Sequence, residues 1–178
     1  MAPHPLAKDA IHQGWLTFPA LGRRAPRVRR FVFAFQEYQA TGSEMHEMDT
    51  HNKGYLLKPG RVYAEIAFVR LLGRAGWNAV WIDNYKGKSW RDMPYRKRVA
   101  GLPDAEQTLY DEIEHASGRG GCWDIWAWRG NQHLFVEAKR IGRDKIRTNQ
   151  LRWLEAATSV GLPQSLFCVA GWFLEGRD

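Results

Sequence analysis

Apolar residues recur along this chain with two periods, and the longer period marks the helices. From residue 61 to 74 they recur at helical spacing, and Gly76 follows the end of the run. The same spacing occupies 148–160, where Gly161 closes it. Residues 103–117 carry acidic side chains around an apolar stripe. The pattern therefore predicts three helices.

Strand-favouring aromatic and β-branched residues fill four other segments, which are 77–85, 122–129, 133–140 and 165–174. The pair Gly130-Asn131 separates the second from the third of these segments and suits a tight two-residue hairpin turn. Apart from the acidic helix, the order is helix, strand, strand, strand, helix, strand (αβββαβ). We expect an α/β fold with one mixed β-sheet flanked by helices.

The rest of the chain surrounds this core. Residues 1–58 look irregular, and a basic run leads into the apolar stretch 31–35, which predicts an arm followed by a short strand. The arginines of the arm are Arg23, Arg24, Arg27, Arg29 and Arg30. Residues 59–178 form the predicted core, with an insertion at about 86–118 between the first two core strands that begins as a polar, basic loop.

Charge changes the picture more than size does. With 178 residues, 44% of them hydrophobic, the chain suits one globular domain. A net charge of +7 favours a polyanionic partner such as nucleic acid. The chain has only two cysteines and no apolar stretch long enough to span a bilayer, and its N-terminus lacks a signal-peptide core. We expect a soluble, cytoplasmic protein with no membrane partner.

Counting across the Gly130-Asn131 turn places Asp124 directly opposite Glu137, and Lys139 opposite Cys122 on the same side. Opposed Cβ atoms lie about 4.5 to 5.5 Å apart, so two carboxylates and a lysine converge on one patch. Two such carboxylates repel each other unless a cation binds, and oxygen ligands select Mg²⁺ or Mn²⁺. Lys139 can then orient or help deprotonate an attacking water.

The alternative is a solvated strand face, because a Glu-x-Lys triplet also arises by chance. Here Trp126 and Trp128 lie on one face of the strands, and Ile125 and Ala127 on the other. Both faces therefore look covered, and charges set into a doubly covered sheet need a partner or a purpose. We favour the functional interpretation.

Two helical residues are candidates to join the patch. Glu65 shares its helix stripe with Phe68 and Leu72, so it is either a third metal-site carboxylate or an ordinary surface glutamate. Gln150 lies one turn before Trp153, so it either faces the patch or caps the first turn of its helix.

At these residues the chain resembles the PD-(D/E)xK nuclease superfamily and, within it, the VRR-NUC (virus-type replication-repair nuclease) family. The matching stretches are 63–85 and 120–171, notably GGCWDIWAW and HLFVEAKR. The resemblance implies a restriction-endonuclease-like core. Trp123 stands where the family often has proline, and residues 1–58 match nothing in the family.

The resemblance also implies a role for each residue of the patch. Asp124, Glu137 and the main-chain carbonyl of Ala138 look like metal ligands, with Glu65 as a further carboxylate. Lys139 looks like the catalytic lysine and Gln150 like the helical glutamine of the family.

Basic and aromatic side chains extend this candidate site. Those placed to hold phosphates beside the metal are Arg140, Arg143, Lys145, Arg147 and Arg152, and the arginines of the arm could extend the contact along DNA. The alternative is a solvated basic surface. Trp15 and Trp90, expected in loops, could stack on unpaired bases.

Two other chemistries are weaker candidates. His46, Asp49 and His51 invite a zinc interpretation, but their spacing fits no tight structural motif and no cysteine lies nearby. Cys122 lacks a histidine to activate it, so a buried thiol is the better interpretation.

The sequence thus predicts a Mg²⁺- or Mn²⁺-dependent endonuclease that hydrolyses phosphodiester bonds, with DNA favoured over RNA. The resemblance suggests branched or flapped DNA, processed in repair or in a mobile element or phage of bacterial or phage-like origin. Analogy with small nucleases suggests a homodimer. The alternative is a catalytically silent nucleic-acid-binding or assembly subunit that keeps the nuclease fold.

Overall fold

The computed structural model describes residues 3–20, 25–38, 56–58, 62–83, 88–92, 98–99, 102–118 and 120–176. Its helices are α2 (Ala64–Arg74), α3 (Asp104–Ser117) and α4 (Thr148–Ser159), with a short 3-10 helix η1 (Gln164–Leu166). Its strands are β1 (His12–Thr17), β2 (Arg27–Tyr38), β3 (Leu56–Lys58), β4 (Asn78–Asp83), β5 (Lys88–Trp90), β6 (Arg98–Val99), β7 (Ile125–Arg129), β8 (Gln132–Arg140) and β9 (Phe167–Leu174). None of the described helices is long and apolar enough to cross a membrane.

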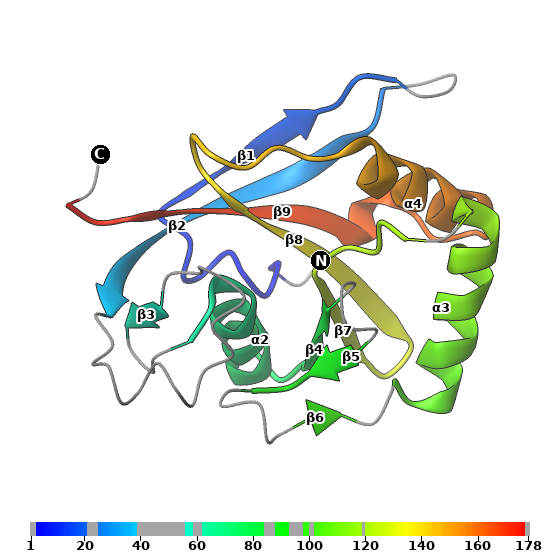
Figure 1. The fold of residues 1–178 in the computed structure, drawn as a ribbon, viewed down its shortest axis with the longest axis horizontal. Coiled ribbons are helices and arrows are strands. Elements are labelled where there is room, and N and C mark those ends of the chain that lie inside the picture. Colours follow the sequence, from blue (N-terminus) through cyan, green and yellow to red (C-terminus); the bar gives the residue numbers. More distant parts are fainter. Residues whose placement is uncertain are drawn as a thin grey trace.

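These strands form one mixed sheet in the order β1-β2-β9-β8-β7-β4-β5-β6, with β3 paired to β2 (Figure 1). β9 is parallel to both β2 and β8, whereas the pairs from β8 to β6 are antiparallel. The predicted order is present as α2, β4, β7, β8, α4 and β9. The prediction of a mixed α/β sheet is confirmed.

Both faces of the sheet are covered. Ile125 and Ala127 of β7 belong to one buried cluster, which includes the apolar face of α2. Trp126 and Trp128 belong to another, which includes residues of α3 and α4. Figure 1 shows α2 apart from the pair α3 and α4. The alternation along β7 therefore separates two cores, as predicted, and we call their sides the α2 face and the α4 face.

The prediction of a basic arm before a short strand is wrong for the described residues. β2 is a strand of 12 residues that already includes Arg27, and it forms a hairpin with β1. Its arginines alternate with apolar residues such as Val28, which is the pattern of a strand with one exposed face, and charge alone obscured it. Arg23 and Arg24 lie outside the described residues. β2 pairs with β9, so the sheet is continuous across the expected boundary at residue 58.

The insertion also differs from its prediction. The acidic helix is present as α3, but the expected polar loop contains the short strands β5 and β6, which extend the sheet beyond β4. Trp90 pairs with Trp81 and is only 5% exposed. Its expected role of stacking on unpaired bases is therefore wrong, because its ring belongs to the core.

Candidate active site

The β7–β8 hairpin has the predicted register. Ladder pairs run from Arg129–Gln132 to Ile125–Val136, and Asp124 and Glu137 are the next residues. The Asp124 N–H donates to Glu137 Oε2 at 3.2 Å, and the Ala138 N–H donates to Asp124 Oδ2 at 3.0 Å. Asp124 and Glu137 are thus cross-strand neighbours at the point where the ladder ends.

Glu137 is fully buried, and its carboxylate is held from three directions. Oε1 accepts from Gln150 Nε2 at 2.5 Å and lies 2.5 Å from Lys139 Nζ. Gln150 Oε1 in turn accepts the Arg147 N–H at 2.9 Å, which closes the first turn of α4. Both alternatives for Gln150 therefore hold, because one end of its amide caps the helix while the other fixes Glu137.

A cavity of about 440 Å³ opens beside this pair, and its walls come from elements far apart in the sequence. The predicted residues in its lining are Glu65, Asp124, Lys139, Arg147 and Gln150. Glu65 reaches it from the first turn of α2, which settles the choice between a surface glutamate and a member of the site.

The charges in the cavity are out of balance. Burial, with the Asp124 carboxylate as the second cause, raises the pKa of Glu65 to about 7. Burial also raises the pKa of Asp124 and, together with the charge of Asp124, the pKa of Glu137. Burial alone would lower the pKa of Lys139, but Glu137 and Asp124 outweigh it and raise that pKa. One ammonium serves three carboxyl groups, so a cation would stabilise their ionised forms.

The donors suit a hard cation. No three His, Cys, Asp or Glu side chains of the described residues form a metal-binding group by themselves, so main-chain or solvent oxygens would have to complete the shell. The N–H and C=O of a strand residue point to the same side, so the Ala138 carbonyl faces the Asp124 side as its N–H does. Asp124, Glu137 and this carbonyl offer oxygen alone, as Mg²⁺ and Mn²⁺ prefer.

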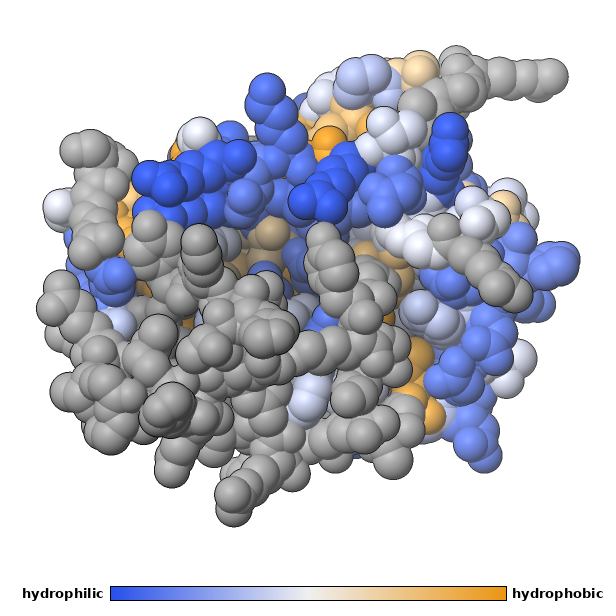
Figure 2. All heavy atoms as spheres, viewed as in Figure 1, coloured by the Kyte–Doolittle hydropathy of each residue, from blue (hydrophilic) through white to orange (hydrophobic). Residues whose placement is uncertain are grey.

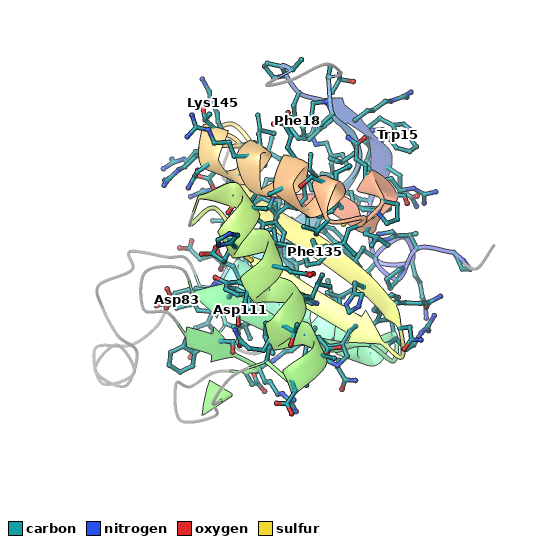
Figure 3. The ribbon with its side chains drawn as sticks, turned by 90° about the vertical axis from the view of Figure 1, so that its right-hand side faces the viewer. Trp15, Phe18, Asp83, Asp111, Phe135 and Lys145 are labelled. Carbon is teal, nitrogen blue, oxygen red and sulfur yellow. The ribbon has the colours of Figure 1, made fainter. Side chains whose placement is uncertain are left out.

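The predicted phosphate-binding residues divide into two groups. Arg143, Lys145 and Arg152 are exposed in the 141–147 connection or on α4, and Figure 3 shows Lys145 pointing outward. In Figure 2, strongly hydrophilic residues form a band over the β8–α4 connection. Arg140 is different, because it is 9% exposed, points to the α2 face and lies 5.6 Å from the Trp172 ring. Its predicted role beside the metal is wrong, since the two-residue period turns it away from Glu137 and Lys139.

The same period divides the arginines of β2. Arg30 pairs with Val169, which pairs with Glu137, so Arg30 lies on the α4 face. Its Nε is 3.4 Å from the position that a Cβ on Gly171 would occupy, and Gly171 pairs with Lys139. Arg27 and Arg29 therefore lie on the α2 face. Only Arg30 of these three is near the candidate active site.

Two residues of the cavity wall were not foreseen, Asp83 and Asn149. Asp83 is buried at the end of β4, and an acid that closes an apolar strand was a usable signal. Asn149 carried none, because its position depends on Gly121. A Cβ on Gly121 would lie 2.3 Å from the Asn149 carbonyl oxygen, so only glycine allows this approach.

The other candidate chemistries add nothing to this site. Cys122 is buried and burial raises the pKa of its thiol, in agreement with the buried-thiol interpretation. The candidate zinc ligands His46, Asp49 and His51 lie outside the described residues.

Comparisons of the chain with protein-family models, with curated proteins and with solved structures found no significant match. The case for function therefore rests on the geometry of the site.

Proposed function

We propose that this protein is a Mg²⁺- or Mn²⁺-dependent nuclease that hydrolyses phosphodiester bonds of DNA. The observation that carries the proposal is the cluster of Asp124, Glu137 and Lys139 at the wall of one cavity, with Glu65 facing them from α2. The basic connection 141–147 and the net charge of +7 suit a polyanionic substrate.

A bound metal would supply electrostatic stabilisation of charge on the phosphate oxygens and a lower pKa for water. Asp124, Glu137 and the Ala138 carbonyl would hold it. Lys139, 2.5 Å from Glu137, positions the attacking water and shares its proton. Gln150 holds Glu137 in place, and Arg147 at the cavity wall binds a phosphate oxygen. Attack on phosphorus breaks the bond to the leaving oxygen, which takes up a proton.

The order α2, β4, β7, β8, α4 and β9 supports the finer proposal of a restriction-endonuclease-like core of the PD-(D/E)xK type. In that arrangement two carboxylates and a lysine lie where the hairpin ladder ends, as they do here. By this resemblance we propose branched or flapped DNA as the substrate and a homodimer as the form that cuts two strands.

The direct test is cleavage of labelled single-stranded, duplex, flapped and four-way DNA, with parallel RNA, in Mn²⁺ and in chelator. Wild type should cut only with metal, and Glu137→Gln should lower the rate about 100-fold or more. Glu106→Gln is the matched control, because Glu106 is also buried, in α3, but does not line the cavity. Equal cleavage by Glu137→Gln and wild type would refute the site.

Metal binding is tested separately from cleavage. Mn²⁺ should raise the Tm of wild type, because a ligand that binds only the folded state stabilises it, and Asp124→Asn should abolish the rise. Salt-sensitive DNA binding without cleavage in any metal would instead favour the catalytically silent subunit.

A further inference from the structure

Trp15 is a large aromatic side chain that the fold leaves in solvent. It lies on the edge strand β1 and is 54% exposed, whereas Trp81, Trp126 and Trp153 are buried. Among the described residues, only Ile11 and Ile141 are other large apolar side chains with comparable exposure. An exposed tryptophan contributes little to folding, so its position suggests a binding partner.

Two arginines of β2 flank this ring. Trp15 pairs with Arg29 and Thr17 pairs with Arg27, so all of these side chains project on the α2 face. The guanidinium carbons of Arg27 and Arg29 lie 4.7 and 5.8 Å from the Trp15 ring centroid, within cation–π range. Neither arginine has an ion pair with a carboxylate in the part of the chain that the structure describes. Two positive charges thus accompany one open aromatic face.

A hollow of about 280 Å³ adjoins the ring. Its lining consists of Gln13, Gly14, Trp15, Arg29 and Phe31, and no acidic residue is among them. Gly14 leaves the floor of the hollow without a side chain, and Gln13 supplies an amide at its edge. The hollow therefore combines an aromatic wall, a cation and a neutral hydrogen-bonding group.

This combination fits an unpaired nucleotide better than a duplex or a protein. A base offers a flat face to stack on Trp15, and its phosphates can pair with Arg27 and Arg29. A duplex keeps its base faces stacked inside the helix, so it cannot use the ring. Two guanidinium groups without carboxylate partners, in a chain of charge +7, favour a polyanion over a second copy of this basic protein.

The Trp15 hollow is separate from the catalytic cavity. Trp15 and Arg29 lie on the α2 face, whereas Glu137 and Lys139 lie on the α4 face. Figure 3 shows Trp15 and the cavity-lining residue Asp83 on opposite sides of the molecule. A nucleotide at Trp15 is therefore not the one whose phosphate reacts.

We propose that Trp15, Arg27 and Arg29 form a stacking platform that holds an unpaired strand of nucleic acid away from the cleavage site. The choice of nucleic acid rests on the proposed function, and the platform makes the substrate one with single-stranded segments.

Fluorescence anisotropy with a labelled oligothymidylate of about 20 nucleotides, in chelator so that no cleavage occurs, tests the platform. Trp15→Ala should weaken binding about tenfold, and Trp15→Phe should restore part of the loss because it keeps a stacking face. Ile11→Ala, which removes the exposed apolar residue just before β1, should bind like wild type. Binding of a blunt duplex should be the same for Trp15→Ala and wild type.

The arginines have their own signature. The Arg27→Ala/Arg29→Ala double variant should reduce the slope of log K against log salt by about 0.7 for each phosphate of the single strand that these arginines neutralise in wild type. Circular dichroism melts should show the same fold in every variant. An unchanged oligothymidylate affinity in both Trp15→Ala and the double variant would overturn the platform.

The two proposals fail in different ways. Loss of oligothymidylate binding in Trp15→Ala, with no cleavage by wild type in any metal, would retain the platform and remove the nuclease. Metal-dependent cleavage by wild type, with oligothymidylate binding indifferent to Trp15, would do the reverse.

Discussion

Glu137 has no exposed surface, yet its neighbours satisfy both of its carboxylate oxygens. Counting across a two-residue turn was enough to place Asp124 beside it, because the ladder geometry of a hairpin is local. The contribution of Gln150 was open, since its amide could serve the helix or the patch, and it serves both. At this scale, residue spacing predicts neighbours but not the partners supplied by other elements.

His4 is a buried titratable residue remote from the candidate site. Its ring stacks on Phe31 at 4.3 Å, and its Nδ1 accepts the Leu6 N–H. Burial, with a smaller contribution from Arg29, lowers its pKa from 6.5 to about 4. Between these pH values the unfolded chain binds more protons than the folded one, so stability present above pH 6.5 is lost as the pH falls towards 4.

We therefore expect His4→Phe, which keeps a stacked ring but does not titrate, to gain stability relative to wild type on acidification. The gain at pH 5 should be about 1–2 kcal/mol compared with pH 7.5, measured by urea unfolding. Groups common to both proteins cancel in this difference. A difference in unfolding free energy that does not change with pH would contradict the assignment.

At the scale of elements, close contacts between segments set the position of Asp124. The segment before β7 lies against the start of α4, where Trp123 Nε1 donates to the Gln150 carbonyl and Gly121 touches Asn149. Gly121 has φ +95°, so its conformation and its surroundings both require glycine. This contact brings the Asp124 and Gln150 segments together.

Gly121→Ala should destabilise the fold more than Gly120→Ala. Gly120 also has a positive φ but open space around it, so its substitution should cost about 1–2 kcal/mol in unfolding free energy. Gly121→Ala adds a backbone clash and should cost about 1–3 kcal/mol more. Thermal and urea unfolding measure both values. Equal losses would show that the contact with Asn149 is not rigid.

The alternation of β2 makes Arg30 a distinct residue among the arginines. It lies over Gly171 on the α4 face, where a phosphate next to Lys139 would be within its reach. Arg30→Ala should lower kcat/KM for DNA cleavage about tenfold, and Arg30→Lys should recover part of it.

Arg74→Ala is the matched control for Arg30, because it removes the same charge from the exposed end of α2. Equal kcat/KM losses in the two alanine variants would mean that only net charge matters and that Arg30 has no specific contact.

At the scale of the whole molecule, residues expected to form an appendage belong to the sheet. β2 is the parallel neighbour of β9, and its Phe31 and Phe33 are buried in the cluster that contains α2. Phe33 packs edge-on against Phe68 of α2 with ring centroids 4.9 Å apart. The hairpin β1–β2 therefore completes the fold and carries both Arg30 and the Trp15 platform.

Removal of residues 1–38 should leave a chain without a cooperative unfolding transition, because it uncovers β9 and half of one core. In the full chain, Phe33→Ala should cost about 3–5 kcal/mol. Circular dichroism melts and urea titrations measure both. A truncated chain that melts as sharply as wild type would restore the interpretation of residues 1–58 as a dispensable extension.

The sequence by itself determined the hairpin register, the apolar stripes of α2 and α4, and so the proximity of Asp124, Glu137 and Lys139. These follow from turn chemistry and from periods of two and 3.6, which act over a few residues. The tertiary structure decided which residues of other elements join them. It brought Glu65 and Asp83 to the cavity, turned Arg140 away, and placed Arg30 and Trp15 on opposite faces of one hairpin. Pairing between strands distant in sequence depends on covering both faces of the sheet, and no local pattern specifies it.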